Sequence, residues 1–143
     1  MTVLDDLSES TTDLLFAALD YAMENAALAA QGFVPFALLQ RSDDTRGLSR
    51  FVSDGDLTDS VIAGRAALAT VPAGTTAVAL AWDGYLTVGG DRSEAVFVEA
   101  HEVGMPKSVL LGQRYTRSDG AVEPVGNPIF QAETEPLARA IEP

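Results

Sequence analysis

One histidine and the carboxylate two residues before it are the side chains whose types and spacing best suit chemistry. His101 is the only histidine, and an imidazole is the side chain that most readily exchanges protons near neutral pH. Glu99 lies at a spacing that places both residues on one face of a strand. A tight turn over residues 104–107 would bring three side chains of the next strand toward the same end of the sheet: Gln113, Arg114 and Tyr115.

This polar group has three interpretations. It suits acid–base catalysis, it could hold a metal weakly through one imidazole and carboxylates, or it is a surface cross-strand pair that simply stabilises the sheet. We expect the surface pair, with no catalytic residue, no metal and no cofactor. If the domain binds a ligand instead, the candidate residues are Glu99, His101, Gln113, Arg114, Tyr115 and Trp82.

Aromatic residues offer two further possibilities. One set could line a ligand pocket between sheet and helices or simply fill the core, and it consists of Trp82, Tyr85, Phe97 and Tyr115. Phe33, Phe36 and Phe51 flank the first expected hairpin and could fill the core or form an apolar sheet edge. Because an apolar edge is normally paired, and two-fold pairing is the commonest way, we expect a homodimer.

The charge balance disfavours polyanionic partners. The chain has 9 basic and 21 acidic residues among 143, a net charge of −12, and no basic cluster. We therefore expect no binding to nucleic acid or to an anionic membrane surface. Cysteine is absent, which excludes disulfides and thiolate chemistry. The N-terminus lacks the basic start and apolar core of a secretory signal, so we expect a soluble cytoplasmic protein.

Periodicity predicts two helices and a series of strands. The first helix begins near residues 10–12 and stops at Gly32, and a second begins at the cap Asp54-Gly55-Asp56 and ends by Pro72. Asp54, Asp56 and Thr58 also begin like a calcium loop, but the glycine and closing glutamate of such a loop are missing, so we interpret the segment as a cap. Strands are expected over residues 33–41, 48–53, 77–88, 94–103, 108–117 and 121–125.

These elements predict an α+β fold in two layers. We expect an antiparallel sheet of about five to six strands with two helices on one face, in the order α-β-β-α-β-β-β(-β). Residues 1–143 would form one domain with irregular termini at 1–9 and 131–143. Asp83-Gly84 is either a bulge within a long strand or a hairpin turn, and we favour the bulge.

Five short segments between Gly32 and Phe130 resemble a group of small uncharacterised bacterial α+β proteins. They are Gly32-Phe-Val-Pro-Phe-Ala, Val78-Ala-Leu-Ala-Trp-Asp, Val98-Glu-Ala-His-Glu, Gly112-Gln-Arg-Tyr and Gly126-Asn-Pro-Ile-Phe. The resemblance implies no particular activity. Nucleotide-binding glycine motifs and the Gly-x-Ser-x-Gly elbow are absent. We therefore expect a protein-interaction or assembly module that binds another protein or itself, with a small enzyme or ligand-binding domain around Glu99 and His101 as the alternative.

Overall fold

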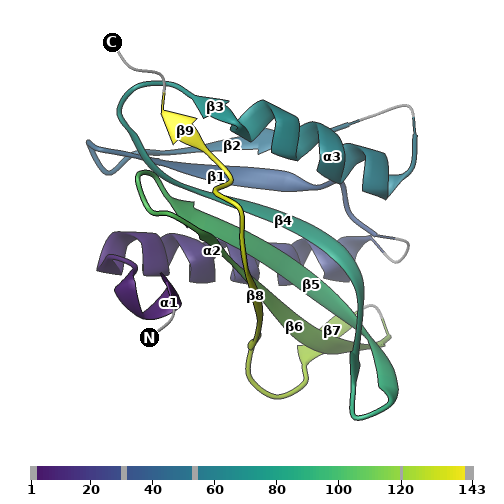
Figure 1. The fold of residues 1–143 in the computed structure, drawn as a ribbon. Helices are drawn as coiled ribbons and strands as arrows, with labels where there is room; N and C mark the ends of the chain where they lie inside the picture. The colour runs from purple at the N-terminus through teal and green to yellow at the C-terminus, as the bar shows by residue number, and fades with distance from the viewer. Residues whose placement is uncertain (1–2, 30–31, 53–54, 120, 141–143) are drawn as a thin grey trace.

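Seven antiparallel strands form the main sheet, in the spatial order β2-β1-β4-β5-β6-β7, with β8 also paired to β6. The computed structural model describes residues 3–29, 32–52, 55–119 and 121–140. The long central hairpin of β4 and β5 forms the middle of the sheet (Figure 1). The strands are β1 (Phe36–Arg41), β2 (Arg46–Arg50), β4 (Thr75–Val88), β5 (Asp91–Glu102), β6 (Ser108–Ser118), β7 (Ala121–Pro124) and β8 (Ile129–Thr134). The expected α+β class with an antiparallel sheet is confirmed.

Side-chain caps start the two long helices. α2 (Glu9–Leu28) begins after Ser8, whose hydroxyl oxygen accepts a hydrogen bond from the Thr11 N–H. α3 (Leu57–Leu68) begins after Asp56, which forms a reciprocal capping box with Asp59. The cap expected at Asp56 is confirmed, whereas Asp54 lies outside the described residues. The first helix starts slightly earlier and ends earlier than expected, before Gly32.

The two long helices lie on opposite faces of the sheet, which corrects the expected placement on one face. α2 packs against the alanines of β4, at 77, 79 and 81, and against Val98 of β5. Leu68 of α3 belongs to a second cluster with Val78 and Leu80, which alternate with those alanines. The physical reason is that every residue from 77 to 81 is apolar and buried. A strand that is apolar on both faces needs cover on both.

Residues Asp83 and Gly84 form neither the expected bulge nor the alternative turn. β4 runs through them with unbroken pairing, in which Asp83 faces Val96 and Gly84 faces Ala95 of β5. Gly84 has a packing role instead. A Cβ there would lie 3.1 Å from the Phe97 ring, so the glycine leaves room for that ring on the sheet.

The terminal segments are more regular than expected. Residues Val3–Asp6 form the short helix α1, and β8 occupies part of the tail that was expected to be irregular. Beyond β8, the chain crosses the α3 face, and β9 (Arg139–Ala140) pairs in parallel with β3 (Thr70–Val71) (Figure 1). We call residues 134–140 the C-terminal strap.

Phenylalanines of the first hairpin region are not an exposed edge. Phe33 and Phe36 are buried in the α2 cluster. Phe51 is half-buried beneath α3, where its ring would lie 2.9 Å from a Cβ at Gly64. The observation on which the homodimer rested was therefore wrong, and dimer formation itself stays a prediction.

Candidate functional site

Glu99 is a fully buried carboxylate with a partner on each oxygen. Oε1 forms an ion pair with Arg65 of α3, and Oε2 accepts a hydrogen bond of 2.6 Å from the Thr134 hydroxyl. A buried charge is tolerated in this way when it is paired and hydrogen-bonded. Arg65 also lies 5.4 Å above the Trp82 ring. The arrangement joins α3, the sheet and the C-terminal strap.

His101 is buried, with 1% of its surface exposed, so the expectation of a surface cross-strand residue was wrong. Its Nε2 lies 3.0 Å from the carbonyl oxygen of Met105, and its Nδ1 accepts a hydrogen bond of 3.2 Å from the Ala138 N–H. A carbonyl only accepts, so Nε2 carries the hydrogen and the imidazole is neutral. The C-terminal strap covers this part of the face, which strand alternation in the sequence does not reveal.

Ser108 belongs to the same buried group, and the sequence analysis missed it. Its hydroxyl oxygen accepts a hydrogen bond of 2.9 Å from the Leu137 N–H. The register that pairs Ala100 with Val109 brings Ser108 opposite His101. The sequence could have indicated Ser108 through its place just after a turn and opposite the only histidine. That pairing can be inferred only when the length of the turn is known.

Gln113 and Tyr115 do not join Glu99 and His101, contrary to expectation. β5 and β6 pair Glu99 with Leu110, whereas Gln113 faces Val96 farther along the strands. Gln113 and Tyr115 point to the α2 face, as the contacts of Tyr115 with the α2 cluster show. The Gln113 amide donates to the carbonyl oxygens of Val125 and Gly126, which fixes the chain after β7.

Arg114 faces Ala95, also distant from Glu99 along the strand. Its guanidinium lies 3.2 Å from the position that a Cβ at Gly126 would take. Of the six candidate ligand-binding residues, Glu99, His101 and Trp82 lie close together on the α3 face. Arg65 links Glu99 with Trp82, whereas His101 is bonded to Met105 and Ala138.

Tyr115 donates a hydrogen bond of 2.9 Å to Asp83 on the α2 face. Burial raises the pKa of Tyr115 well above its usual value, and the neighbouring Asp83 carboxylate raises it further. Burial also raises the pKa of Asp83, although the hydrogen bond from Tyr115 opposes that shift. Arg117 lies 5.7 Å above the Tyr115 ring and donates to the carbonyl oxygen of Ala26 near the end of α2. The group fastens the helix to the sheet.

Trp82 lines an aromatic groove beside α3. Its ring stacks on Phe97 with centroids 5.8 Å apart, and Tyr85 is also among the residues that line the groove. The groove encloses about 330 Å³ and is lined by Leu57, Thr58, Val61, Trp82, Asp83, Gly84, Tyr85 and Phe97. Three of the four expected pocket aromatics meet here, whereas Tyr115 lies on the other face.

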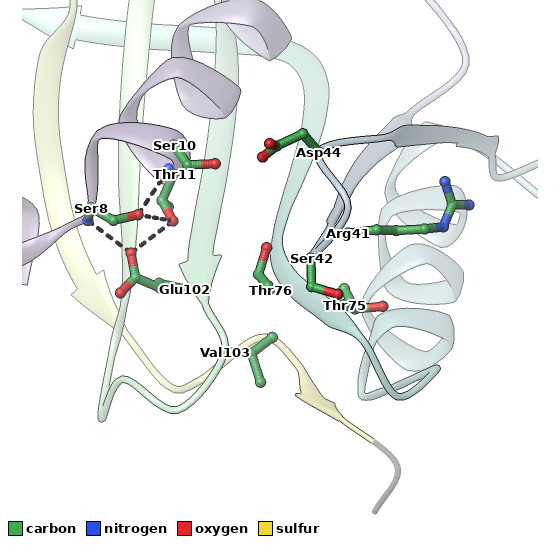
Figure 2. A pocket seen from close by; sticks show the side chains of 10 residues that line it. All are labelled: Ser8, Ser10, Thr11, Arg41, Ser42, Asp44, Thr75, Thr76, Glu102 and Val103. Atoms are coloured by element: carbon green, nitrogen blue, oxygen red, sulfur yellow. Dashed lines mark hydrogen bonds between the residues drawn. The ribbon is translucent and has the colours of Figure 1, made fainter.

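A polar cleft lies between the start of α2 and the β1–β2 hairpin (Figure 2). Glu102 Oε1 accepts hydrogen bonds from the Ser8 N–H (2.8 Å) and the Thr11 hydroxyl (2.7 Å). Burial alone would raise the pKa of Glu102, but these hydrogen bonds outweigh it and hold that pKa below its usual value. Arg41 extends away from the other lining side chains in Figure 2. The hydrogen bonds tie the start of α2 to the end of β5.

β2 forms an edge of the sheet that no described strand covers. The Arg41 N–H donates to Thr45, and the Phe51 N–H donates to Pro35, so residues 45 and 51 point their backbone groups toward β1. In an antiparallel pair, the backbone groups of successive residues point alternately toward the partner strand and away from it. Three residues of β2 therefore point their N–H and C=O groups away from β1, toward the open edge. They are Arg46, Leu48 and Arg50.

The side chains of these same three residues lie on the α2 face. Arg50 donates to the Tyr21 hydroxyl and to Asn25 of α2, and Arg46 donates to Gln40. Leu48 lies between them with 48% of its surface exposed. Within the part of the chain that the structure describes, the ion pairs are Arg65–Glu99 and Lys107–Glu135, so neither arginine of β2 has a carboxylate partner.

Comparison with known protein families, with curated proteins and with solved structures finds no match. The resemblance to small bacterial proteins therefore stays a prediction. No described helix has the length and apolar character needed to cross a membrane. Among the described side chains, no three carboxylate or imidazole groups come together as a metal site.

Proposed function

We propose that this protein is an interaction module that binds an extended segment of another protein as an additional strand beside β2. The observation that carries the proposal is the open edge of β2, where Arg46, Leu48 and Arg50 direct their backbone groups outward. Their side chains lie on the α2 face, where they would be next to the side chains that an incoming strand places on that face. Strand addition uses such backbone groups for affinity and alternate side chains for specificity.

The opposite side of the sheet is a poorer site for strand addition. β7 ends in Pro124, which has no N–H to donate. The β6–β8 pairing contains an irregularity between Leu110 and Leu111. Prolines and bulges are two means by which proteins protect sheet edges. β2 contains neither feature.

The arginines indicate the chemistry of the partner strand. Two copies of β2 paired about Leu48 would place Arg46 opposite Arg50, and like charges directly opposite destabilise a pair of strands. A strand with acidic, apolar and acidic residues at alternate positions would instead pair with Arg46, Leu48 and Arg50. At physiological salt the Debye length is about 8 Å, so acids of the chain farther away than this are screened. Glu9, Asp13 and Asp44 line one cleft with Arg46, so Arg50 carries most of the preference for an acidic partner.

A peptide titration followed by NMR tests the proposal. The probe is the end-blocked peptide Thr-Glu-Thr-Leu-Thr-Glu-Thr, and its matched control has lysine in place of glutamate. We expect saturable amide shifts centred on β2 with the acidic peptide only. Leu48→Pro should abolish binding, because it removes an outward N–H that β1 does not use, whereas Leu48→Ala keeps the N–H and should retain most of it.

Three results would contradict the proposal. They are equal binding of both peptides, shifts centred away from β2, and unchanged binding by the proline variant. Concentration-dependent shifts in β2 without peptide would favour self-association and contradict the choice of an acidic partner. Leu48→Lys serves as a second variant if the proline variant does not fold.

The alternative expected from the sequence, ligand binding around Glu99 and His101, has less support. Both side chains are buried and bonded within the protein. For a small apolar ligand, the aromatic groove beside Trp82 is the better candidate, because it is open and contains the stacked rings of Trp82 and Phe97. NMR spectra recorded with such a ligand would show its binding as chemical-shift changes at Trp82 and Tyr85.

A further inference from the structure

The C-terminal strap is held by side chains that accept hydrogen bonds from two consecutive backbone N–H groups. Leu137 donates to the Ser108 hydroxyl oxygen, and Ala138 donates to Nδ1 of His101. Leu137 and Ala138 are both buried against the α3 face. Beyond them, within the described residues, the two-residue pairing of β9 with β3 continues the attachment.

The bond to His101 requires a neutral imidazole. Nε2 uses its hydrogen on the Met105 carbonyl, and Nδ1 offers its lone pair to the Ala138 N–H. A proton added at Nδ1 would turn this acceptor into a donor that faces another donor. A buried donor left without an acceptor is costly, so the protonated ring favours a state in which the strap has moved away.

The charged side chains described on the surrounding elements do not remove this conflict. Glu99 is paired with Arg65, and Glu102 accepts from the start of α2. Lys107, in the turn before β6, is paired with Glu135 of the strap. The carboxylates favour a charged ring and the cations oppose it. In the attached state the Ala138 N–H donates to Nδ1, and these carboxylates are bonded to other groups.

We propose that His101 and the C-terminal strap form a pH-sensitive latch, in which the neutral imidazole holds the strap and protonation releases it. Release uncovers Leu137 and Ala138 and opens the polar group of Glu99, His101 and Ser108 to water. The attached state binds fewer protons than the released state, so its stability is complete at high pH and falls as the pH decreases. A free imidazole takes up a proton near pH 6.5, so the released fraction should rise below about pH 6.5 and approach a tenfold increase per pH unit at lower pH.

Amide hydrogen exchange at Leu137 and Ala138 measures this equilibrium. Protection is expressed relative to the intrinsic exchange rate at each pH. We expect the protection of Ala138 to fall about fivefold between pH 6.5 and pH 5.5 in the wild type. His101→Asn places an amide oxygen near the position of Nδ1 and cannot titrate, so its protection should not change with pH. Ser108→Ala should lower protection at both pH values and keep the ratio of about fivefold.

A second readout does not depend on the variants. The ¹⁵N shifts of the His101 ring should show the tautomer with hydrogen on Nε2 at pH 7.5. A ring with hydrogen on Nδ1 would contradict the latch. So would wild-type protection that is independent of pH, or an equal fall in His101→Asn.

Discussion

At the scale of single residues, polar side chains fasten distant segments to the sheet. Glu99 binds α3 and the strap through Arg65 and Thr134. Glu102 binds the start of α2 through Ser8 and Thr11. Hydrogen bonds to charged groups are the stronger ones, and each of these carboxylates joins segments that are far apart in sequence.

Glu102 should give the folded state a small stability that depends on pH. Its pKa is lowered from 4.5 on folding, so the contribution is complete above the unfolded value and is lost as the pH falls through the lower folded value. Because the side chain is still partly exposed to solvent, Glu102→Gln should cost only about 0.5 kcal/mol at pH 7. Urea unfolding of both proteins from pH 7 to pH 3 checks this. A difference that persists unchanged at pH 3 would contradict the assignment.

The sequence identified Glu99 and His101 as unusual residues but not their surroundings. Their spacing correctly placed them on one face, because that depends only on strand geometry. Their burial depends on the strap, which reaches them from more than thirty residues away and has no periodic pattern. Gln113 and Tyr115 were assigned to the wrong group because a strand's register decides both position and face.

At the scale of elements, local signals predicted the helices and most strands, whereas the faces required the tertiary structure. The Asp56 cap and the turns depend on neighbouring residues and were predicted. Residues 77–81 alternate between alanine and mostly larger side chains, which suggested one helix-covered face, yet both faces are buried. β8 escaped prediction because prolines surround it. Its pairing with β6 depends on distant residues.

Gly64 tests how closely α3 approaches the sheet. A Cβ there would lie 2.9 Å from the Phe51 ring and 3.1 Å from Leu80. Gly64→Ala should therefore destabilise the fold by about 1–3 kcal/mol, although alanine favours a helix by about 1 kcal/mol. The matched control is Ala63→Gly at the exposed neighbouring position, which should cost about 1 kcal/mol from helix propensity alone. Thermal or urea unfolding measures both, and a stabilised Gly64→Ala variant would contradict this packing.

At the scale of the whole molecule, a strongly acidic chain presents arginines along its open sheet edge. The net charge of −12 disfavours nucleic acid, whereas Arg46 and Arg50 flank an exposed leucine on β2. Overall charge and local surface thus indicate different partners. We infer the acidic partner from the arginines of β2, because charge pairs within the Debye length interact strongly, whereas charges farther away are screened.

Hydrogen exchange of the Leu48 amide tests strand addition most directly. In the free protein its N–H points away from β1, so it should exchange rapidly, while the Gly47 and Ser49 amides are protected by β1. Saturating acidic peptide should slow exchange at Leu48 at least tenfold and leave the protection of Gly47 and Ser49 in place, and the lysine peptide should change none of them. A Leu48 amide that is already protected in the free monomer, or that stays unprotected while the peptide is bound, would contradict strand addition at β2.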